Sequence, residues 1–206
     1  MKETNNEAKE KISLAKELFD IFEILVIAAC VVLLLYSFIC RLCVVSGNSM
    51  DTTLAHGQML AVSNIGYTPV RGDIIVFHQT SDEIVGLNEP IVKRVIATAG
   101  ETVNIDFDTW TVKITDKDGN TDVLDESGYM YLKEGYAITT WDWDGPVIVP
   151  DGYLFVMGDN RNHSTDSRST YIGLVDTRRV IGKAIFRLSP FEKFGKLDLE
   201  KVKNAD

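Results

Sequence analysis

Cysteine is scarce in this chain: only three of its 206 residues are cysteines, and none lies beyond position 43. A disulfide framework needs an even set of cysteines spread through a domain, and a structural zinc site needs Cys and His at short, characteristic spacings. Neither pattern occurs here. The sequence therefore predicts no disulfide framework and no metal centre.

Basic residues are also few relative to acidic ones. The chain has 21 Lys and Arg against 30 Asp and Glu, a formal net charge of −9, which argues against a general nucleic-acid binder. It has no low-complexity or collagen-like bias, and 45% hydrophobic residues are too many for a disordered chain. We therefore expect a folded, acidic domain that has no nucleic-acid partner.

One apolar stretch near the N-terminus is unusually long. The residues from Ile24 to Cys40 (ILVIAACVVLLLYSFIC) carry no charge, which corresponds to about 25 Å of α-helix, and apolar neighbours extend it toward the roughly 30 Å of a hydrocarbon core. A helical spacing of apolar residues over 9–22 leads into it. We expect residues 19–42 to form one transmembrane anchor in contact with membrane lipid. A buried helix is the alternative, and a cleaved signal peptide is disfavoured because the run is too long and no small-x-small site follows it.

Lysines indicate the orientation of this anchor. Four of them precede it, at positions 2, 9, 11 and 16, whereas residues 41–60 contain a single basic residue, Arg41. By the positive-inside rule, the tail at 1–18 lies in the cytoplasm and the domain at 43–206 lies outside. We therefore expect a single-pass protein of the cell membrane. Its cysteines then lie in or near lipid as small apolar side chains.

Beyond Val45 the sequence changes to short runs rich in Val, Ile, Thr and aromatic residues, separated by Gly, Asp and Asn. We expect strands at residues 59–63, 74–78, 91–97, 102–105, 110–115, 153–157 and 180–188. Asp118-Gly119, between the strand at 110–115 and a short segment at 122–124, is a hairpin signal of type I′. Long helical periodicity is absent, so the predicted fold is mainly β: an antiparallel β-sheet domain preceded by a single N-terminal transmembrane α-helix.

Residues 106–150 have the character of an accessory insert with hairpin turns. The insert contains Trp141 and Trp143. Two tryptophans near a membrane can form an interfacial contact. We favour the alternative, in which they pack beneath a loop.

Two residues in separate segments suggest nucleophilic chemistry. Gly47 and Asn48 permit an unusual backbone just before Ser49, which would expose its hydroxyl, but a serine needs a base to become a nucleophile. Lys93 shares one face of an apolar strand with Ile91 and Val95, where desolvation lowers a lysine pKa. A pKa near 8 would require roughly 3 kcal/mol of differential destabilisation, which a buried amine can reach. Taken singly, Ser49 is more simply a turn residue and Lys93 a snorkelling side chain.

A third segment, Gly158 to Arg168, follows directly on the apolar run 153–157 and is rich in Asp, Asn, Arg and Ser. Such a segment can be a solvated surface turn. It can also be a buried network in which Asp and Arg neutralise one another.

Taken together, these segments resemble those of the bacterial type I signal peptidases, which are membrane-anchored serine proteases. Ser49 to Leu54 (SMDTTL) is similar to the family's SMxPTL nucleophile motif, and Val92 to Val95 (VKRV) is similar to its lysine motif. Arg71 to Phe77 (RGDIIVF) resembles the RGDIVVF strand, and Gly158 to Arg168 (GDNRNHSTDSR) resembles the GDNRxxSxDSR box. The segments occur in the family's order, behind an anchor of the expected topology.

The resemblance implies a role for each of these positions. Ser49 would be the nucleophile, with its own backbone N–H in the oxyanion hole, Lys93 the general base, and Ser164 the hydroxyl that orients the lysine amine. Some relatives carry a serine two positions before the nucleophile; here that residue is Gly47, so any second oxyanion donor is a backbone group or is absent. Two ion pairs would support the site: Asp159 with Arg94, and Asp166 with Arg168.

The resemblance also implies the substrate. The enzyme would remove signal peptides from exported preproteins by cutting after small-x-small sites of the Ala-x-Ala type. Met50, Leu54 and Val92 match the pocket-lining positions, and an extended substrate would pair with a strand edge. No metal and no organic cofactor is needed.

Two departures from the family pattern stand out. Thr52 replaces the motif's proline, which removes a fixed φ beside the nucleophile and is expected to loosen the loop. Thr98 to Glu101 (TAGE) replaces an LPGD-like turn. Neither change removes a group that does chemistry.

Three other functions are compatible with parts of the sequence. A Ser-His-Asp hydrolase would have to use His56, His78 or His163, none of which lies in a G-x-S-x-G setting; we expect all three to be surface or packing residues. A self-cleaving Ser–Lys repressor would carry a DNA-binding domain in place of an anchor. A membrane-tethered interaction module would keep its function when Ser49 is changed to Ala.

Overall fold

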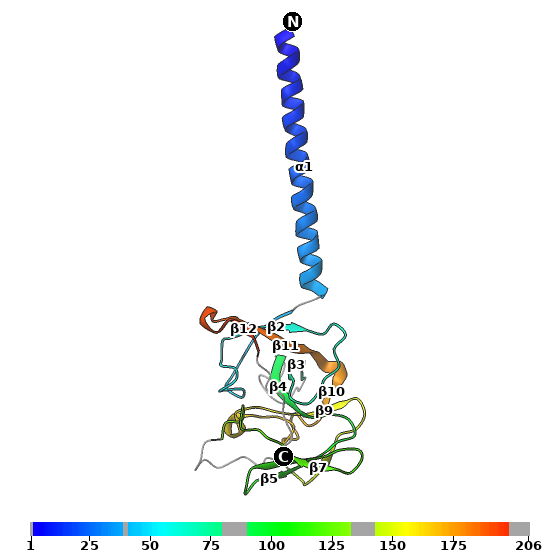
Figure 1. Ribbon diagram of the computed structural model, residues 1–206, viewed down its shortest axis with the longest axis vertical. Helices are drawn as coiled ribbons and strands as arrows, with labels where there is room; N and C mark the ends of the chain where they lie inside the picture. Colours follow the sequence, from blue (N-terminus) through cyan, green and yellow to red (C-terminus); the bar gives the residue numbers. More distant parts are fainter. Residues whose placement is uncertain (1, 39–40, 80–89, 133–142, 198–206) are drawn as a thin grey trace. The chain divides into compact units, whose positions relative to one another are not determined.

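The computed structural model describes residues 2–38, 41–79, 90–132 and 143–197 (Figure 1). The chain divides into two compact units, residues 1–41 and 42–206.

The first unit is one long helix, α1 (Lys2–Phe38). The helical spacing of the sequence over 9–22 and the apolar run as far as Phe38 are thus parts of a single helix. Its described side chains include exposed large apolar ones, such as Phe19 at 65% and Leu33 at 63% exposure. Among the residues that the structure describes, no helix is both long enough and apolar enough to cross a membrane.

The larger sheet of the second unit has the strand order β1-β2-β11-β3-β4-β9-β10, and β12 pairs with β11. Its strands are β1 (Arg41–Val44), β2 (Met59–Ser63), β3 (Ile74–His78), β4 (Pro90–Ala97), β9 (Tyr153–Met157), β10 (Val175–Asp176), β11 (Val180–Ser189) and β12 (Gly195–Lys196). Short 3-10 helices lie at η1 (Arg161–His163), η2 (Thr177–Arg179) and η3 (Phe191–Lys193). Strand β4 is paired on both sides, so that Lys93 lies opposite Ile75 of β3 and Arg94 lies opposite Met157 of β9.

A second sheet, of order β7-β6-β5-β8, lies at the end of the domain opposite β2 and β12 (Figure 1). Its strands are β5 (Thr102–Asp106), β6 (Thr111–Thr115), β7 (Thr121–Val123) and β8 (Val147–Ile148). Three of these strands come from residues 106–150. Apolar side chains of β5 and β6 pack with Phe155 and Met157 of β9 in one buried cluster. The second sheet therefore packs against β9, the strand that leads directly into the polar box at 158–168.

The fold class expected from the sequence is confirmed for its β part: every strand pair with a defined register is antiparallel. The strands expected at 59–63, 74–78 and 153–157 have those bounds, and the other four differ by one residue at one end. Four strands of two to four residues, β1, β8, β10 and β12, were not predicted.

The hairpin predicted at Asp118-Gly119 is confirmed, because β6 pairs antiparallel with β7, one residue away from the expected 122–124, but its turn is not of type I′. Such a turn needs a positive φ at both residues, and only Gly119 has one, at 89°. The Asp116 N–H donates to Asn120 O at 2.9 Å, and the Asp116 carboxylate accepts from the N–H groups of Asp118 and Asn120. Asp116 therefore caps a longer loop in which only the glycine is left-handed.

Trp143 packs against aromatic neighbours, as favoured from the sequence. Its ring lies edge-on to Phe155 at 5.9 Å and to Phe107 at 6.0 Å between ring centroids. Trp141 lies outside the described residues.

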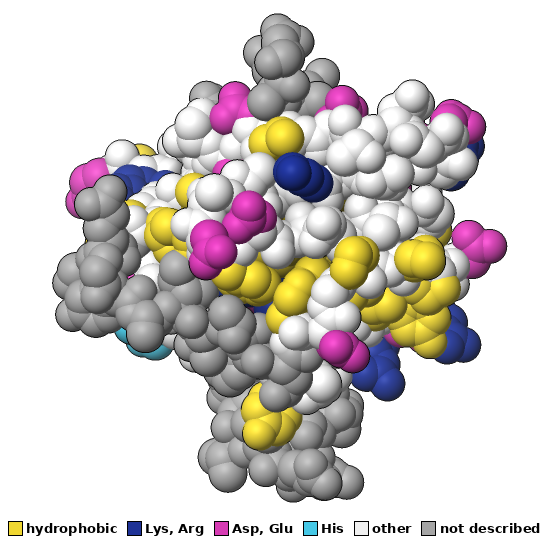
Figure 2. All heavy atoms as spheres, turned by 90° about the horizontal axis from the view of Figure 1, so that it is seen from below, with side chains coloured by type: hydrophobic (Ala, Val, Ile, Leu, Met, Phe, Trp, Pro, Cys, Tyr) yellow, Lys and Arg dark blue, Asp and Glu magenta, His cyan; other side chains and the backbone are white. Residues whose placement is uncertain are grey.

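Figure 2 views the molecule from the end that carries β5 and β7. On this face Lys and Arg side chains are scattered among Asp, Glu and apolar ones (Figure 2). The described residues on this face therefore form no continuous basic surface.

Candidate active site

The loop that carries Ser49 connects β1 to β2, and two of its apolar side chains are buried in the core. Met50 and Leu54 are 1% and 0% exposed and belong to a core cluster that also contains Val92 of β4. The Leu54 N–H donates to Met50 O at 2.7 Å, which closes a turn around the loop. Gly47, with a φ of 81°, provides the left-handed residue that begins the loop. The polar Ser49 is thereby held between an apolar floor and the surface.

Lys93 reaches this serine from the middle of the sheet. Its Nζ donates to Ser49 Oγ at 2.5 Å, and the lysine is only 3% exposed. Burial lowers the pKa of Lys93 to about 8; the carboxylates of Asp166 and Asp159 oppose this shift and the Arg168 guanidinium adds to it. A substantial fraction of this amine is therefore neutral in mildly alkaline solution, and a neutral amine can accept a proton from the hydroxyl it touches.

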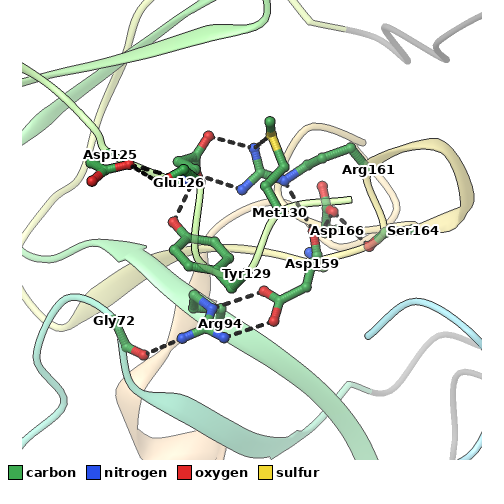
Figure 3. Close-up of polar contacts among 12 residues, drawn as sticks. Gly72, Arg94, Asp125, Glu126, Tyr129, Met130, Asp159, Arg161, Ser164 and Asp166 are labelled. Atoms are coloured by element: carbon green, nitrogen blue, oxygen red, sulfur yellow. Dashed lines mark hydrogen bonds and ion pairs between the residues drawn. The ribbon is translucent and has the colours of Figure 1, made fainter. Parts of the chain in front are cut away.

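Asp159 and Arg94, expected from the sequence to pair, form a bidentate ion pair below this site (Figure 3). Arg94 Nε lies 2.8 Å from Asp159 Oδ1, and the second bond, to Oδ2, is 2.7 Å. Arg94 also donates to Gly72 O at 2.9 Å, while Asp159 accepts from the Thr53 hydroxyl at 2.5 Å. The pair thus joins β4 and the turn before β3 to the nucleophile loop.

The second expected pair, Asp166 with Arg168, is fully buried. Although burial by itself raises the pKa of Asp166, the Arg168 guanidinium outweighs it and holds that pKa below its usual value. Ser164 was expected to orient the Lys93 amine, but its Oγ donates instead to Asp166 Oδ2 at 2.6 Å (Figure 3). Within the described ranges, the hydrogen-bond partner of the Lys93 amine is Ser49. Ser164 therefore binds the Asp166 carboxylate, and that carboxylate in turn raises the pKa of Lys93.

Sequence reasoning missed a further buried cluster from the insert (Figure 3). Arg161 makes two hydrogen bonds to Glu126, at 2.8 and 2.5 Å. The Tyr129 ring stacks on the Arg94 guanidinium at 4.0 Å, and its hydroxyl donates to Glu126 at 2.9 Å. Because Glu126 and Tyr129 lie in a polar stretch with no strand periodicity, no local signal marks them. They extend the polar network from the box into the second sheet's connections.

The backbone N–H groups near Ser49 differ in their availability. The Gly47 N–H donates to His56 Nδ1 at 3.1 Å, so the backbone group at position 47 is already engaged. Among the described residues, no group accepts a hydrogen bond from the Ser49 N–H.

His56, His78 and His163 are all exposed. Within the same described ranges, no three His, Cys, Asp or Glu side chains are grouped to hold a metal ion.

Comparisons with known proteins agree on one family. Residues 18–189 match the family model described as "Signal peptidase, peptidase S26". The chain is 38% identical over 187 residues to "Signal peptidase I" of Bacillus licheniformis, covering 88% of this chain and 94% of that protein. It is 35% identical to "Probable signal peptidase I-1" of a Synechocystis species, covering 84% of each. A crystal structure of a signal peptidase I from Enterococcus faecalis superposes with a TM-score of 0.41 at 30% identity, over 57% of this chain and 97% of that one.

Proposed function

Because the chain belongs to the signal peptidase family, peptidase S26, we propose that Ser49 is its nucleophile and Lys93 its general base. Membership of the family makes the protein a serine peptidase and a hydrolase that removes signal peptides. One observation carries the assignment of the two residues: a buried lysine amine lies 2.5 Å from a serine hydroxyl. Each residue alone has a simpler structural explanation; the contact between them does not.

The proposed reaction follows from this contact. The neutral Lys93 amine takes the Ser49 hydroxyl proton as Oγ attacks the scissile carbonyl carbon, and the Ser49 N–H donates to the oxyanion that forms. The Lys93 ammonium then gives its proton to the leaving amine, and the acyl bond to Ser49 Oγ remains. A water molecule, deprotonated by Lys93, attacks this ester. The bond from the acyl carbon to Ser49 Oγ breaks, the Lys93 ammonium returns the proton to Oγ, and the signal peptide leaves with a free carboxylate. Apart from this water molecule, every group that these steps require is a side chain or backbone group of this chain.

We propose that the substrate is cut after small-x-small sites. Met50, Leu54 and Val92 are at most 6% exposed and share one apolar cluster beside Ser49. Side chains packed this tightly cannot move aside for a bulky substrate residue without strain. Substrates with a bulky residue immediately before the cut should therefore be poor ones.

Incubation of the detergent-solubilised full-length protein with a preprotein tests the proposal, with the cut located by mass spectrometry. We expect cleavage by the wild type and none by Ser49→Ala or Lys93→Met, both of which should remain folded. Lys113→Met is the matched control, because Lys113 is an exposed residue of β6 on the second sheet; it should cleave as the wild type does. Cleavage by Ser49→Ala at the same bond would disprove the assignment.

We also propose that residues 19–42 anchor the protein in the cell membrane, with the tail at 1–18 in the cytoplasm and the domain outside. The uncharged run at 24–40 and the four lysines before it support this topology. With the native cysteines changed to Ala, Asp118→Cys in an exposed loop should react with a membrane-impermeant maleimide in intact cells. Asn5→Cys should react only after the membrane is opened; labelling of Asn5→Cys in intact cells would exclude the topology.

A further inference from the structure

We propose that Asn160 is a positioning residue: it holds the peptide between Asn48 and Ser49 in the orientation that aims the Ser49 N–H at the reacting carbonyl oxygen. The inference rests on the proposed role of Ser49 as nucleophile. Asn160 belongs to the polar box at 158–168, but it takes part in neither of the two ion pairs that support the site.

Asn160 touches both peptide groups that flank Ser49. Its side-chain Nδ2 donates to Asn48 O at 3.1 Å, and its backbone N–H donates to Ser49 O at 3.0 Å. The box also approaches the Ser49 loop closely at Gly158, where an added Cβ would lie 2.4 Å from Ser49 O. Asn160 therefore binds two consecutive main-chain carbonyl groups of the loop, those of Asn48 and Ser49.

Peptide planarity converts the first of these contacts into control of an N–H. In a trans peptide, the C=O of one residue and the N–H of the next lie in one plane and point in opposite directions. A hydrogen bond that fixes the Asn48 carbonyl therefore fixes the direction of the Ser49 N–H. In the described part of the chain that N–H has no acceptor, so it is available to a substrate oxygen.

The other end of the same amide indicates that stability is not the purpose of Asn160. Asn160 is 4% exposed, and its Oδ1 is buried without a donor among the described residues. An unpaired buried oxygen opposes folding, and an apolar side chain of similar size would avoid it. The amide group thus weakens the fold at Oδ1 while it orients the nucleophile at Nδ2.

The test is Asn160→Leu, which keeps the size of the side chain and removes both polar ends. We expect kcat for preprotein cleavage to fall about 10- to 100-fold, because the oxyanion donor is no longer aimed. KM should change less than about twofold, since the substrate pocket is untouched. The pH midpoint set by Lys93 should stay at the wild-type value. The urea midpoint for unfolding should be equal to that of the wild type or higher. Asn120→Leu, in the distant loop after β6, is the matched control and should keep the wild-type kcat.

A peptide aldehyde that forms a tetrahedral adduct with serine gives a second readout. Its affinity for Asn160→Leu should fall by the same factor as kcat/KM, whereas the corresponding peptide alcohol should bind equally to both proteins. Asn160→Asp, which keeps the shape and replaces the donor by an acceptor, should show the same loss of kcat. Wild-type kcat in both variants, or a rise in KM alone, would overturn the inference, and so would loss of the fold in both. Ser49→Ala in the same assay separates these results from failure of the proposed function, because only that failure leaves Ser49→Ala active.

Discussion

The Thr52 hydroxyl donates to Tyr129 O at 3.1 Å, and Thr52 itself has a φ of 84°. A left-handed backbone is unfavourable for a β-branched residue, at a cost of about 1–3 kcal/mol. The family motif has proline here, and proline holds φ near −65°. The loop was expected to be loosened by the missing proline; instead it has a different backbone, held by a hydrogen bond to the insert.

Thr52→Pro, the change toward the family motif, should therefore be harmful in this chain. The proline ring cannot adopt the native φ, so we expect the free energy of unfolding to fall by more than about 1 kcal/mol and kcat to fall with it. Thr52→Gly relieves the strain while it loses the hydroxyl, and should stay close to the wild type in stability. Urea unfolding and the cleavage assay measure both effects. A proline variant as stable and active as the wild type would mean that the loop follows the family backbone.

The sheets were largely predictable because their strands are apolar runs bounded by Gly, Asp or Asn. The apolar runs at 59–63, 74–78 and 153–157 have the same first and last residues as β2, β3 and β9. The ladder of β10 is two residues long and exists because Leu154 of β9 offers Val175 an edge to pair with. Such a partner comes from the fold, and a local pattern does not contain it.

The candidate site was predictable to the extent that its residues lie in recognisable motifs. Ser49 and Lys93 are 44 positions apart, and it was the resemblance to the family that joined them. Glu126 and Tyr129 lie in no motif, and their contacts with Arg161 and Arg94 depend on how the insert folds back. The bond from Ser164 to Asp166 was missed for another reason: a charged carboxylate oxygen accepts a hydrogen bond from a hydroxyl more strongly than a neutral amine does.

The pH dependence of cleavage should follow the ionisation of Lys93. Because burial lowers its pKa to about 8, kcat/KM should rise about tenfold per pH unit below that value and level off above it. Initial rates at substrate concentrations far below KM, measured from pH 6 to 10, give this profile. A flat profile with chemistry rate-limiting would contradict a lysine base.

Asp166→Asn provides the control for this profile. The Asp166 carboxylate raises the pKa of Lys93, so its removal, which also leaves the Arg168 charge unopposed, should move the rising limb to lower pH. Asp116→Asn, in the exposed hairpin loop of the second sheet, should leave the limb in place. A shift toward higher pH in Asp166→Asn would mean that another group controls the profile.

The buried pair of Arg94 and Asp159 should be costly to break from one side. Arg94→Met leaves the Asp159 carboxylate without its bidentate partner at 0% exposure, and such changes typically cost about 3–5 kcal/mol of unfolding free energy. The double variant Arg94→Met with Asp159→Leu should recover part of this loss, because it leaves no unpaired charge. Urea unfolding of the single and double variants measures the difference.

The exposed pair of Arg178 and Asp176 is the comparison. It has the same chemical groups, but the Arg178 side chain is 86% exposed, and water replaces the partner when one is removed. Arg178→Met should therefore hardly move the urea midpoint. Equal losses from Arg94→Met and Arg178→Met would show that burial of the first pair has no influence on stability.

Lys93 should also lower the free energy of unfolding at neutral pH. Its folded-state pKa of about 8 lies below the ordinary lysine value of 10.5, so between these values the unfolded chain binds more protons than the folded one. The free energy of unfolding should therefore increase as pH rises through this window, by about 3 kcal/mol in total for this group. Below pH 8 the folded protein carries the full penalty of a buried ammonium group.

Lys93→Met removes that titration while it keeps an unbranched side chain of similar length. The difference in unfolding free energy between this variant and the wild type cancels every other ionising group that the two proteins share. We expect the variant to be the more stable protein at pH 7, and its advantage to shrink steadily from pH 8 to 10. Urea unfolding at pH 7, 8, 9 and 10 measures this difference. If it is constant over that range, Lys93 ionises alike in the folded and unfolded chain, and the desolvated amine on which the proposed reaction depends is absent.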